Sequence, residues 1–521
     1  MTQPVLKVDD LRVTIGRREI VRGVSFGVHR EQTVGIVGES GSGKSMTVLA
    51  ATGLLDAPGA RVTGSSLLAG SSQLVGASAR ALRAVHGSRI GFVFQDPGTS
   101  LNPLLTLQRQ ITETLETHRK MTRRQARTRA GELLEAVGLS AARLEDYPHQ
   151  LSGGQRQRVM IAIALACDPE LLIADEPTTA LDVTTQAQII ELVADLQRNF
   201  GTAVVWISHD LGVIGQVADE VTVLRAGEAV EQAPILDIFD HPQHAYTQEL
   251  LAARPRLDGP GPEQAPADAP VLLQANGLEV RYGSVQAVRD VSFELRRAST
   301  LGIVGESGSG KSTVAAALTG LAEPSAGTAT LDGTEVFAGG RELRRRISLV
   351  FQDPFASLDP RARVGAAIGE PLRVHRLAAG RRGRAARVAE LLELVGLPKD
   401  FASRYPHELS GGQRQRVSIA RALATEPDVL ILDESTASLD VSVQSKVLDL
   451  LSELQKELGV SYLFIAHDLA VVHRMCHDVL VMRAGEMVEY GPASELFAHP
   501  GHEYTRTLLA AVPPARPREK V

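Results

Sequence analysis

The sequence has only two cysteines in 521 residues, Cys167 and Cys476, which stand far apart and form no CxxC pair. It therefore supports neither a disulfide framework nor a cysteine-ligated metal site, and we expect two buried thiols. No apolar run approaches the roughly 18 residues that cross a bilayer, and the first residues lack the apolar core of a signal peptide. We expect a protein of the cytoplasm with no membrane-spanning segment.

A strong charge of either sign is also missing. The chain carries 55 Lys and Arg residues against 61 Asp and Glu residues, a net charge of −6 at pH 7. This balance gives no overall electrostatic footprint for nucleic acid or anionic lipid, so a polyanion would have to bind locally. Hydrophobic residues make up 44% of the chain and charged residues 22%, as in ordinary globular proteins, and 521 residues are enough for two or more domains.

The sequence contains one set of motifs that occurs twice along the chain. GIVGESGSGKS begins at Gly35 and again at Gly302, and LSGGQRQRV begins at Leu151 and again at Leu409. The segment between the two copies is rich in proline and glycine, which predicts an exposed linker. This tandem duplication predicts copy 1 at 1–252, the linker at 253–270, copy 2 at 271–512 and a tail at 513–521.

Each copy alternates apolar runs with helix-forming stretches. LLIAD at Leu171 and AVVWIS at Ala203 are short and continuously apolar, which favours strands buried on both faces of a parallel sheet. An α/β layered fold is therefore expected for each copy. Copy 1 is the longer between its first two motifs, and we expect the Gly/Ser/Ala-rich stretch from Gly64 to Gly87 to hold the extra residues as a surface loop.

A glycine-rich loop lies between an apolar strand and a helix in each copy. Its pattern, GxxxxGK[ST], lets successive backbone N–H groups point at phosphate oxygens, and the following helix adds the positive end of its dipole. The lysine would reach the β and γ phosphates, and the last serine hydroxyl would bind Mg²⁺. A bare turn with no ligand is the alternative, which the strand and helix on either side disfavour. The loop residues are Gly38, Glu39, Ser40, Gly41, Ser42, Gly43, Lys44 and Ser45, and Gly305, Glu306, Ser307, Gly308, Ser309, Gly310, Lys311 and Ser312.

A strand in each copy ends in two acidic residues, Asp175 and Glu176 in copy 1 and Asp433 and Glu434 in copy 2. Carboxylates at the end of a buried parallel strand lie beside the crevice where nucleotides bind. Asp175 and Asp433 are the candidate Mg²⁺ ligands, and Glu176 and Glu434 are the candidate general bases that polarise the attacking water. The alternative is a solvated acidic pair that closes the strand.

Each copy also contains a strand-end histidine and an SGGQ turn at equivalent positions. His209 and His467 end later strands, where an imidazole could bond the γ phosphate, although a strand-end histidine without a role is the plainer interpretation. SGGQ opens a helix in both copies, and its exposed N–H groups would form a second anion site. The residues of these turns are Ser152, Gly153, Gly154 and Gln155, and Ser410, Gly411, Gly412 and Gln413.

Together these motifs resemble the nucleotide-binding domains of ATP-binding cassette (ABC) proteins over nearly all 521 residues. The resemblance implies an α/β fold of two P-loop domains in tandem, each with a RecA-like core, an antiparallel β subdomain and an α-helical signature subdomain. It also implies that ATP and Mg²⁺ bind, and that the two copies pair head to tail within the chain. Each ATP would then lie between the P-loop of one copy and the SGGQ signature turn of the other.

The resemblance also implies roles for individual residues. Gln95 and Gln352 match the family's glutamine loop, which senses Mg²⁺ and contacts the membrane subunits. Asp182 and Asp440 match the aspartate loop that crosses the dimer. Site one would join Lys44, Ser45, Gln95, Asp175, Glu176 and His209 to Ser410, Gly411 and Gly412. Site two would join Lys311, Ser312, Gln352, Asp433, Glu434 and His467 to Ser152, Gly153 and Gly154.

The sequence departs from the family pattern at two places. Tyr282 fits the aromatic residue that stacks on adenine, but Ile15 stands at the aligned position of copy 1. Since stacking on an aromatic ring is worth about 1–3 kcal/mol per base in nucleic-acid systems, we expect site one to bind ATP more weakly than site two. Ser435 replaces the usual proline of copy 2, which would loosen that turn without removing a catalytic group.

Each copy ends in a similar segment, HPQHAYTQELL from His241 and HPGHEYTRTLL from His499. These segments resemble the C-terminal segment of ATPases from importers of oligopeptides, dipeptides and nickel. The HPxH spacing could hold a metal, but the proline disfavours a regular helix and no further ligand recurs, so a structural cap is the plainer interpretation.

The resemblance implies an ATPase that energises peptide uptake as a peripheral protein on the cytoplasmic face of the cell membrane. Its partners would be two transmembrane permease subunits and, indirectly, an external substrate-binding protein, with no nucleic acid. Nickel, glutathione and opines remain open as cargo. One alternative is a soluble tandem ABC translation factor acting on the ribosome, favoured by the Arg-rich residues 376–387 and disfavoured by the short linker. The third interpretation, a DNA-repair ATPase, is disfavoured because such proteins normally contain zinc-binding cysteines, and these are missing here.

Overall fold

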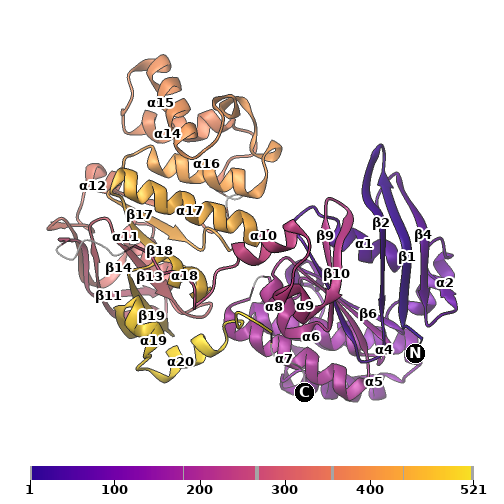
Figure 1. The fold of residues 1–521 in the computed structure, drawn as a ribbon. Helices are drawn as coiled ribbons and strands as arrows, with labels where there is room; N and C mark the ends of the chain where they lie inside the picture. Colours follow the sequence, from indigo (N-terminus) through magenta and orange to yellow (C-terminus); the bar gives the residue numbers. More distant parts are fainter. Residues whose placement is uncertain (1–2, 180, 264–268, 354–356, 438, 518–521) are drawn as a thin grey trace.

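The computed structural model describes residues 3–179, 181–263, 269–353, 357–437 and 439–517. Residues 264–268 of the predicted linker and 518–521 of the predicted tail lie outside the described residues. The chain forms two α/β bodies with the same order of elements, copy 1 from β1 to α10 and copy 2 from β11 to α20 (Figure 1).

A six-stranded sheet forms the core of each copy, in the order β10-β9-β3-β8-β7-β6 in copy 1 and β16-β17-β18-β13-β19-β20 in copy 2. Only the edge pairs β10 with β9 and β20 with β19 are antiparallel among these neighbours. The strands of copy 1 are β3 (Thr33–Val37), β6 (Ile90–Val93), β7 (Leu171–Asp175), β8 (Ala203–Ser208), β9 (Glu220–Arg225) and β10 (Glu228–Pro234). Those of copy 2 are β13 (Thr300–Val304), β16 (Ile347–Val350), β17 (Val429–Asp433), β18 (Ser461–Ile465), β19 (Asp478–Arg483) and β20 (Glu486–Pro492).

The predicted parallel strands are present. LLIAD forms β7 and AVVWIS forms β8, and every residue of β3 and β8 is buried. Continuous burial of this kind is typical of strands inside a parallel sheet. It places the carboxyl ends of β3, β7 and β8, where the candidate site residues follow, at one edge of the sheet.

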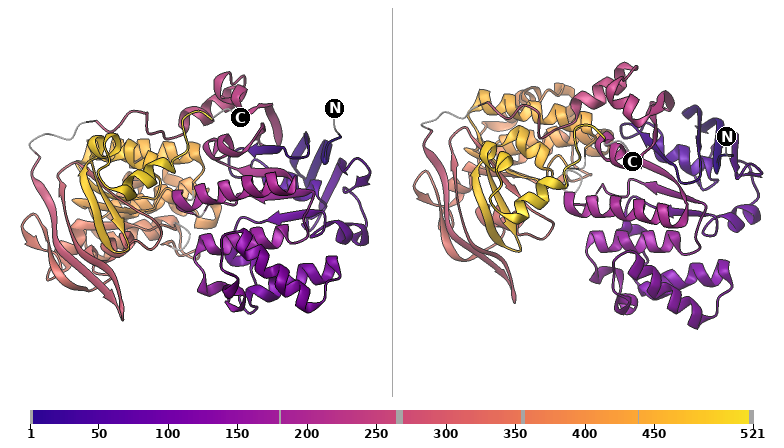
Figure 2. Two further views of the ribbon diagram at one scale, coloured as in Figure 1. Left: turned by 90° about the horizontal axis from the view of Figure 1, so that it is seen from below. Right: turned by 60° about the horizontal axis from the view of Figure 1, so that its bottom comes forward.

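A four-stranded antiparallel sheet is the second layer of each copy, in the order β2-β1-β4-β5 and β12-β11-β14-β15. In copy 1 it contains β1 (Leu6–Ile15), β2 (Arg18–Val28), β4 (Ala60–Leu68) and β5 (Ser72–Gln73). In copy 2 it contains β11 (Val271–Tyr282), β12 (Val285–Arg296), β14 (Pro324–Leu331) and β15 (Thr334–Glu335). In the views of Figures 1 and 2 these two sheets lie at opposite ends of the molecule, so the copies meet through their helices.

The helices of the two copies also correspond. Copy 1 has α1 (Lys44–Ala51), α2 (Ala79–Val85), α3 (Pro97–Ser100), α4 (Leu107–Arg119), α5 (Arg123–Ala136), α6 (Gly153–Leu165), α7 (Val183–Phe200), α8 (Leu211–Val217), α9 (Ile235–Asp240) and α10 (Ala245–Ala253). Copy 2 has α11 (Lys311–Leu318), α12 (Arg341–Arg346), α14 (Val364–Val374), α15 (Gly380–Leu394), α16 (Gly411–Leu423), α17 (Val441–Leu458), α18 (Leu469–Met475), α19 (Ala493–Ala498) and α20 (Glu503–Ala510). Helices α4 to α6 and α14 to α16 pack on one another and form the expected helical subdomains.

The stretch from Gly64 to Gly87 is not the surface loop that we expected. It contains the end of β4, the short strand β5 and helix α2, and Leu68, Leu74 and Val85 are buried. The many small residues resemble a loop composition, but β4 and β5 form a hairpin whose alternate apolar side chains pack into the core beneath the antiparallel sheet.

The C-terminal tail lies against copy 1. Arg254, just after α10, donates hydrogen bonds to the backbone carbonyls of Pro513 and Pro514 over 3.0 and 2.9 Å. Arg516 forms an ion pair with Asp240 of copy 1, at 2.6 Å. The two copies are therefore tied together at the end of the chain as well as through the linker.

Both cysteines are free and buried, as expected. Among the described residues no helix is long and apolar enough to cross a membrane. The Arg-rich residues 376–387 fall mostly on α15 of the helical subdomain, where Arg381 and Arg382 are exposed. An exposed, charged helix face is an ordinary solvated surface, so these arginines give no separate argument for RNA.

Candidate functional site

The glycine-rich loops lie between β3 and α1 in copy 1 and between β13 and α11 in copy 2. Their first glycines could not be replaced without moving the backbone. A Cβ at Gly38 would lie 2.2 Å from the carbonyl oxygen of Leu224, and one at Gly305 would lie 2.2 Å from that of Met482. The loop is thus pressed against the strand next to it, which fixes its curl.

The lysines of the loops are almost fully buried, with 5% of Lys44 and 4% of Lys311 exposed. Lys44 Nζ donates to the carbonyl oxygens of Gly38 at 2.7 Å and Glu39 at 3.1 Å. Lys311 Nζ makes the equivalent bonds within its own loop. Burial lowers the pKa of Lys311, since it disfavours the charged amine. An anion in the loop would stabilise that buried charge.

A serine and an aspartate meet beside each lysine. Ser45 Oγ donates to Asp175 Oδ1 over 2.9 Å, and Ser312 Oγ donates to Asp433 Oδ1 over 3.0 Å. Hydroxyl and carboxylate oxygens are the ligands that Mg²⁺ prefers. Burial raises the pKa of both aspartates, and a divalent cation would favour the ionised form that burial disfavours. These pairs therefore fit Mg²⁺.

Glu176 and Glu434 follow β7 and β17 in an unusual backbone conformation, with φ of 46° and 43°. Residues other than glycine rarely adopt positive φ, and such strain, of order 1–3 kcal/mol, persists where the surroundings enforce it. Here the N–H of Glu176 donates to Ile207 and that of Glu434 to Ile465, on the neighbouring strands, over 3.0 and 2.9 Å. These bonds hold the positive-φ turn of each copy against the neighbouring strand.

The carboxylate of Glu176 accepts hydrogen bonds from three side chains. Gln95 Nε2 lies 2.9 Å and Thr179 Oγ1 3.0 Å from its Oε2, and His209 Nδ1 lies 3.3 Å away. Burial alone would raise the pKa of Glu176, but His209, Lys44 and Thr179 together lower it to about 2. The glutamate is therefore ionised throughout the physiological range.

Copy 2 repeats this arrangement with one partner missing. Gln352 Nε2 lies 2.6 Å and His467 Nδ1 3.6 Å from Glu434 Oε2. The hydrogen bond from His467 lowers the pKa of Glu434 against the effect of burial. Ala437 stands where copy 1 has Thr179, so it can donate no hydrogen bond. In both copies the glutamine that the resemblance assigns to sensing Mg²⁺ donates a hydrogen bond to this glutamate.

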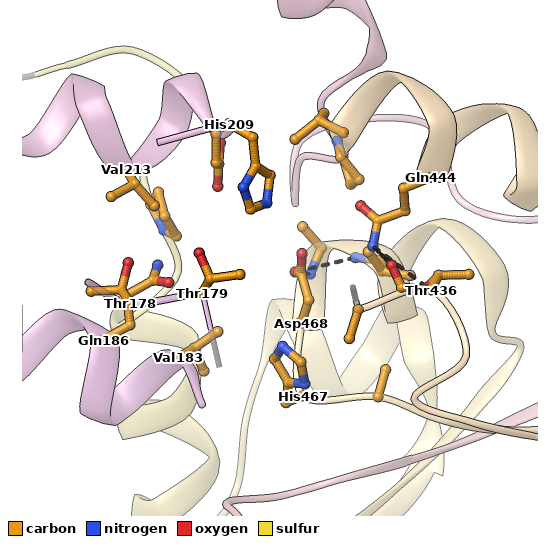
Figure 3. A pocket seen from close by; sticks show the side chains of 18 of the residues that line it. Thr178, Thr179, Val183, Gln186, His209, Val213, Thr436, Gln444, His467 and Asp468 are labelled. Atoms are coloured by element: carbon orange, nitrogen blue, oxygen red, sulfur yellow. Dashed lines mark hydrogen bonds between the residues drawn. The ribbon is translucent and has the colours of Figure 1, made fainter. Parts of the chain in front are cut away.

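The two histidines are mostly buried and paired with these glutamates. Burial disfavours their charged form, but the hydrogen bond and charge of the glutamate outweigh it and raise the pKa of both His209 and His467. They also line one cavity of about 110 Å³ between the copies. Figure 3 shows His209 and Thr179 reaching this cavity from copy 1, and His467 and Asp468 reaching it from copy 2.

The aspartate loops cross between the copies. Ser40 in the P-loop of copy 1 donates its N–H to Asp440 Oδ1 of copy 2 over 2.8 Å. In the reciprocal contact Asp182 accepts from the N–H of Ser307. A cavity of about 260 Å³ is lined by loop residues of copy 1, by Gln95 and Glu176, and by Asp440. This head-to-tail contact makes each copy part of the other's phosphate loop.

The hydrogen bonds of the SGGQ turns lie within their own copies. Ser152 Oγ accepts a hydrogen bond from the N–H of Gln155 over 3.3 Å, and the side chain of Gln155 accepts one from the N–H of Ser152 over 3.1 Å. These two bonds form a capping box at the start of α6. Ser410 and Gln413 form the same box on α16. Among the described residues, no hydrogen bond or ion pair joins either turn to the other copy's loop.

The residue expected to stack on adenine lies at a hairpin end. Tyr282 ends β11 with 52% of its surface exposed, whereas Ile15 ends β1 and packs partly against the core beneath it. In copy 1 Ile20, on β2, is also among the residues that line the loop cavity, and sequence reasoning missed it. No spacing pattern pointed to it.

The HPxH segments act as helix caps. His244 Nδ1 accepts from the N–H of Tyr246 at the start of α10, and His502 Nδ1 accepts from that of Tyr504 at the start of α20. No group of three potential His, Cys, Asp or Glu ligands occurs in the part of the chain that the structure describes. The capping interpretation is therefore the one that the structure supports.

Two family models match the chain, each of them twice. The ABC transporter model matches residues 21–179 and 288–437. The model of the oligopeptide/dipeptide transporter C-terminal region matches residues 230–277 and 488–521. Each copy thus contains the ATP-binding part followed by the same C-terminal region.

Relatives match over nearly the whole chain. The chain is 46% identical to the glutathione import ATP-binding protein GsiA of Pectobacterium atrosepticum over 549 aligned residues, covering 97% of this chain and 88% of that protein. It is 45% identical to the protein of the same name from Escherichia coli K12, covering 98% of this chain and 90% of that one. A solved structure, cbiO1 of Clostridium perfringens, is similar at 32% identity and a TM-score of 0.41, covering 44% of this chain and 91% of that chain.

These relatives are import proteins, so the translation-factor and DNA-repair interpretations of the sequence no longer stand. The chain belongs to the ABC transporter family, and it is a fused tandem ATP-binding subunit of an importer of the oligopeptide/dipeptide group, an ATPase that works with ATP and Mg²⁺.

Proposed function

We propose that this subunit powers the uptake of glutathione or closely related short peptides. The observation that carries the proposal is the 46% identity, along 97% of the chain, to a protein named for glutathione import. Glutathione is itself a tripeptide, so the peptide cargo expected from the sequence and the glutathione alternative become one proposal. Nickel and opines have no such support from the relatives described above.

We also propose the assembly in which it works. The subunit would bind two transmembrane permease subunits as a peripheral protein on the cytoplasmic face of the membrane, and an external protein would deliver the substrate. The proposed units are 1–252, 253–270, 271–512 and 513–521, supported by the repeated order of elements.

The site residues suggest how ATP would be cleaved. Ser45 and Asp175 would hold Mg²⁺, which neutralises phosphate charge, and the N–H groups of the loop would bind the phosphates. Glu176 would orient and polarise the attacking water, which its ionised state allows. His209 would exchange its bond with Glu176 for one with the γ phosphate. The same roles fall to the equivalent residues of copy 2, Ser312, Asp433, Glu434 and His467.

Closure of the copies would complete each site. The aspartate loops already touch the opposite P-loops, whereas the SGGQ turns contact their own copy. We propose that ATP binding brings each turn, at the positive end of α6 or α16, onto the phosphates held by the other copy. Gln95 and Gln352 would pass this movement to the permeases.

An uptake assay tests the cargo. Cells of the source organism that lack this subunit should lose uptake of radiolabelled glutathione, and the intact chain should restore it, whereas the variant Glu176→Gln/Glu434→Gln should not. Labelled dipeptides and nickel measured in the same cells are the competing cargoes. Restored uptake of nickel with no change in glutathione would contradict the proposal.

A pull-down of the tagged Glu176→Gln/Glu434→Gln variant with ATP, from gently solubilised membranes, tests the assembly. We expect mass spectrometry to identify two multi-span permeases and a substrate-binding protein. Recovery of ribosomal proteins without permeases would refute the proposed partners.

A further inference from the structure

Glu39, the second residue of the copy 1 P-loop, connects three parts of the molecule. Its N–H donates to Tyr246 Oη over 3.0 Å, and its carbonyl accepts from Lys44 Nζ. Its carboxylate accepts from the hydroxyl of Ser442, which belongs to copy 2. One residue thus touches the C-terminal region of its own copy, the phosphate-binding lysine and the opposite copy.

Copy 2 repeats this connection with its own residues. The N–H of Glu306 donates to Tyr504 Oη over 3.1 Å, and its carbonyl accepts from Lys311 Nζ over 2.8 Å. Its carboxylate accepts from Thr184 Oγ1 of copy 1 over 2.7 Å. Because two separate stretches of sequence form the same connection, it is a built feature of the fold.

The tyrosines are held firmly in place. Tyr246 and Tyr504 are only 2% and 5% exposed. The guanidinium carbon of Arg225 lies 4.8 Å from the ring centroid of Tyr246, and that of Arg483 lies 5.0 Å from Tyr504, within the range of cation–π attraction. Burial, the main cause, raises the pKa of both hydroxyls to about 12, so they remain neutral acceptors for the loop N–H.

The helices that carry these tyrosines in their first turn also pack on the opposite copy. Helix α10 contacts α17 of copy 2, and α20 contacts α7 of copy 1. Glu249 on α10 forms an ion pair with Lys446 on α17 at 3.4 Å. Since α7 and α17 directly follow the aspartate loops, each C-terminal helix lies between its own P-loop and the opposite aspartate loop.

We propose that Tyr246 and Tyr504 are positioning residues of the two ATP sites. Each hydroxyl holds the second residue of its P-loop so that the glutamate side chain reaches the hydroxyl after the opposite aspartate loop. The C-terminal region is thereby part of the device that pairs the copies around ATP. This inference concerns ATP binding by the chain itself, and it does not depend on the cargo or on the permeases.

The variant Tyr246→Phe/Tyr504→Phe tests this idea, because it keeps both buried rings and removes only the hydroxyls. The N–H groups of Glu39 and Glu306 then lose their acceptor. The cost of such a loss corresponds to about a five- to tenfold weaker interaction. We expect the KM for ATP of the purified full chain to rise by about this factor, with kcat changed less than about twofold.

The matched control is Tyr490→Phe. Its hydroxyl donates to the carbonyl of Glu294 on β12 over 3.2 Å, not to a P-loop, so its removal should leave the KM unchanged. Hydrogen exchange gives a second measurement that needs no turnover. The loop peptides that contain Glu39 and Glu306 should exchange faster in the tyrosine pair variant, and at the wild-type rate in Tyr490→Phe.

Combination with Glu39→Ala/Glu306→Ala separates positioning from general stability. If the hydroxyls act through the glutamates, adding the tyrosine changes to these variants should alter the KM less than about twofold, since interacting residues are not additive. The proposal is overturned if the tyrosine pair leaves the KM and loop exchange at wild-type values, if Tyr490→Phe has the same effect, or if the two pairs of changes multiply.

Discussion

The second glycine of each signature turn is packed against the helix that follows the aspartate loop of the same copy. A Cβ at Gly412 would lie 2.3 Å from Cγ1 of Val443, whereas a Cβ at Gly411 would meet only Leu439 Cδ2, at 3.6 Å. Val443 lies on α17, where a β-branched side chain has one strongly preferred rotamer and cannot easily turn away. Gly412→Ala should therefore destabilise the protein, and Gly411→Ala should not.

The magnitude follows from two opposing effects. Overpacking a tight site costs about 1–3 kcal/mol. Alanine is favoured over glycine inside a helix by up to about 1 kcal/mol, which offsets part of this cost. We expect Gly412→Ala to lose about 1–2 kcal/mol, at about 2–4 °C of melting temperature for each kcal/mol in a domain of this size. Gly411→Ala should melt at or slightly above the wild-type temperature.

Thermal unfolding followed by circular dichroism measures this, with Val443→Ala as the rescuing change. Removing the valine methyl groups makes room for the new Cβ, so Gly412→Ala should cost little in a Val443→Ala background. Equal melting of the two glycine variants would refute the packing argument. So would an unchanged cost of Gly412→Ala after Val443 has been shortened.

Three further predictions concern the ATP sites. Glu176→Gln combined with Glu434→Gln should lower ATP turnover by about 10²–10⁴-fold, and near-normal phosphate release would show that these glutamates are not the bases. The ion pair of His209 with Glu176 should stabilise the fold above about pH 4.3, the unfolded glutamate value, and below the raised pKa of the histidine. The melting temperature of His209→Gln should thus fall furthest below wild type near pH 5–6 and approach it as the pH rises above neutrality, whereas a gap that is constant with pH would contradict this. ATP titration of Lys311→Ala, which leaves site one, should give weaker binding than Lys44→Ala, and equal affinities would refute the stacking role of Tyr282.

Most of the architecture could be predicted from the sequence because its signals are local. Runs of four and five consecutive apolar residues favour burial on both faces, so β7 and β8 were predictable as core strands. The strand, glycine-rich turn and helix around Lys44 follow one another without a gap, and the turn ends where α1 begins. Because the chain is duplicated, each of these predictions holds for both copies.

The parts that escaped prediction depend on contacts between distant segments. The residues from Gly64 to Gly87 look like a loop by composition, and only the pairing of β4 with β5 and with β1 makes them part of the sheet. Thr179 looks like any threonine after a strand until the positive φ of Glu176 turns the carboxylate toward it. The role of Tyr246 could have been found from the sequence, because a tyrosine stands at the same place in both C-terminal segments.

The contacts between the copies suggest which part of the molecule stays joined while the ATP sites change. Asp440, Ser442 and the helix α17 form one group that meets the P-loop and α10 of copy 1. The equivalent group of copy 1, Asp182, Thr184 and α7, meets the P-loop and α20 of copy 2. The second glycines of the signature turns, Gly154 and Gly412, pack beside Thr185 and Val443 of these same groups. Each signature turn is therefore packed against the group that touches the opposite P-loop, so a rotation about these contacts would carry the turn toward the phosphates held in that loop.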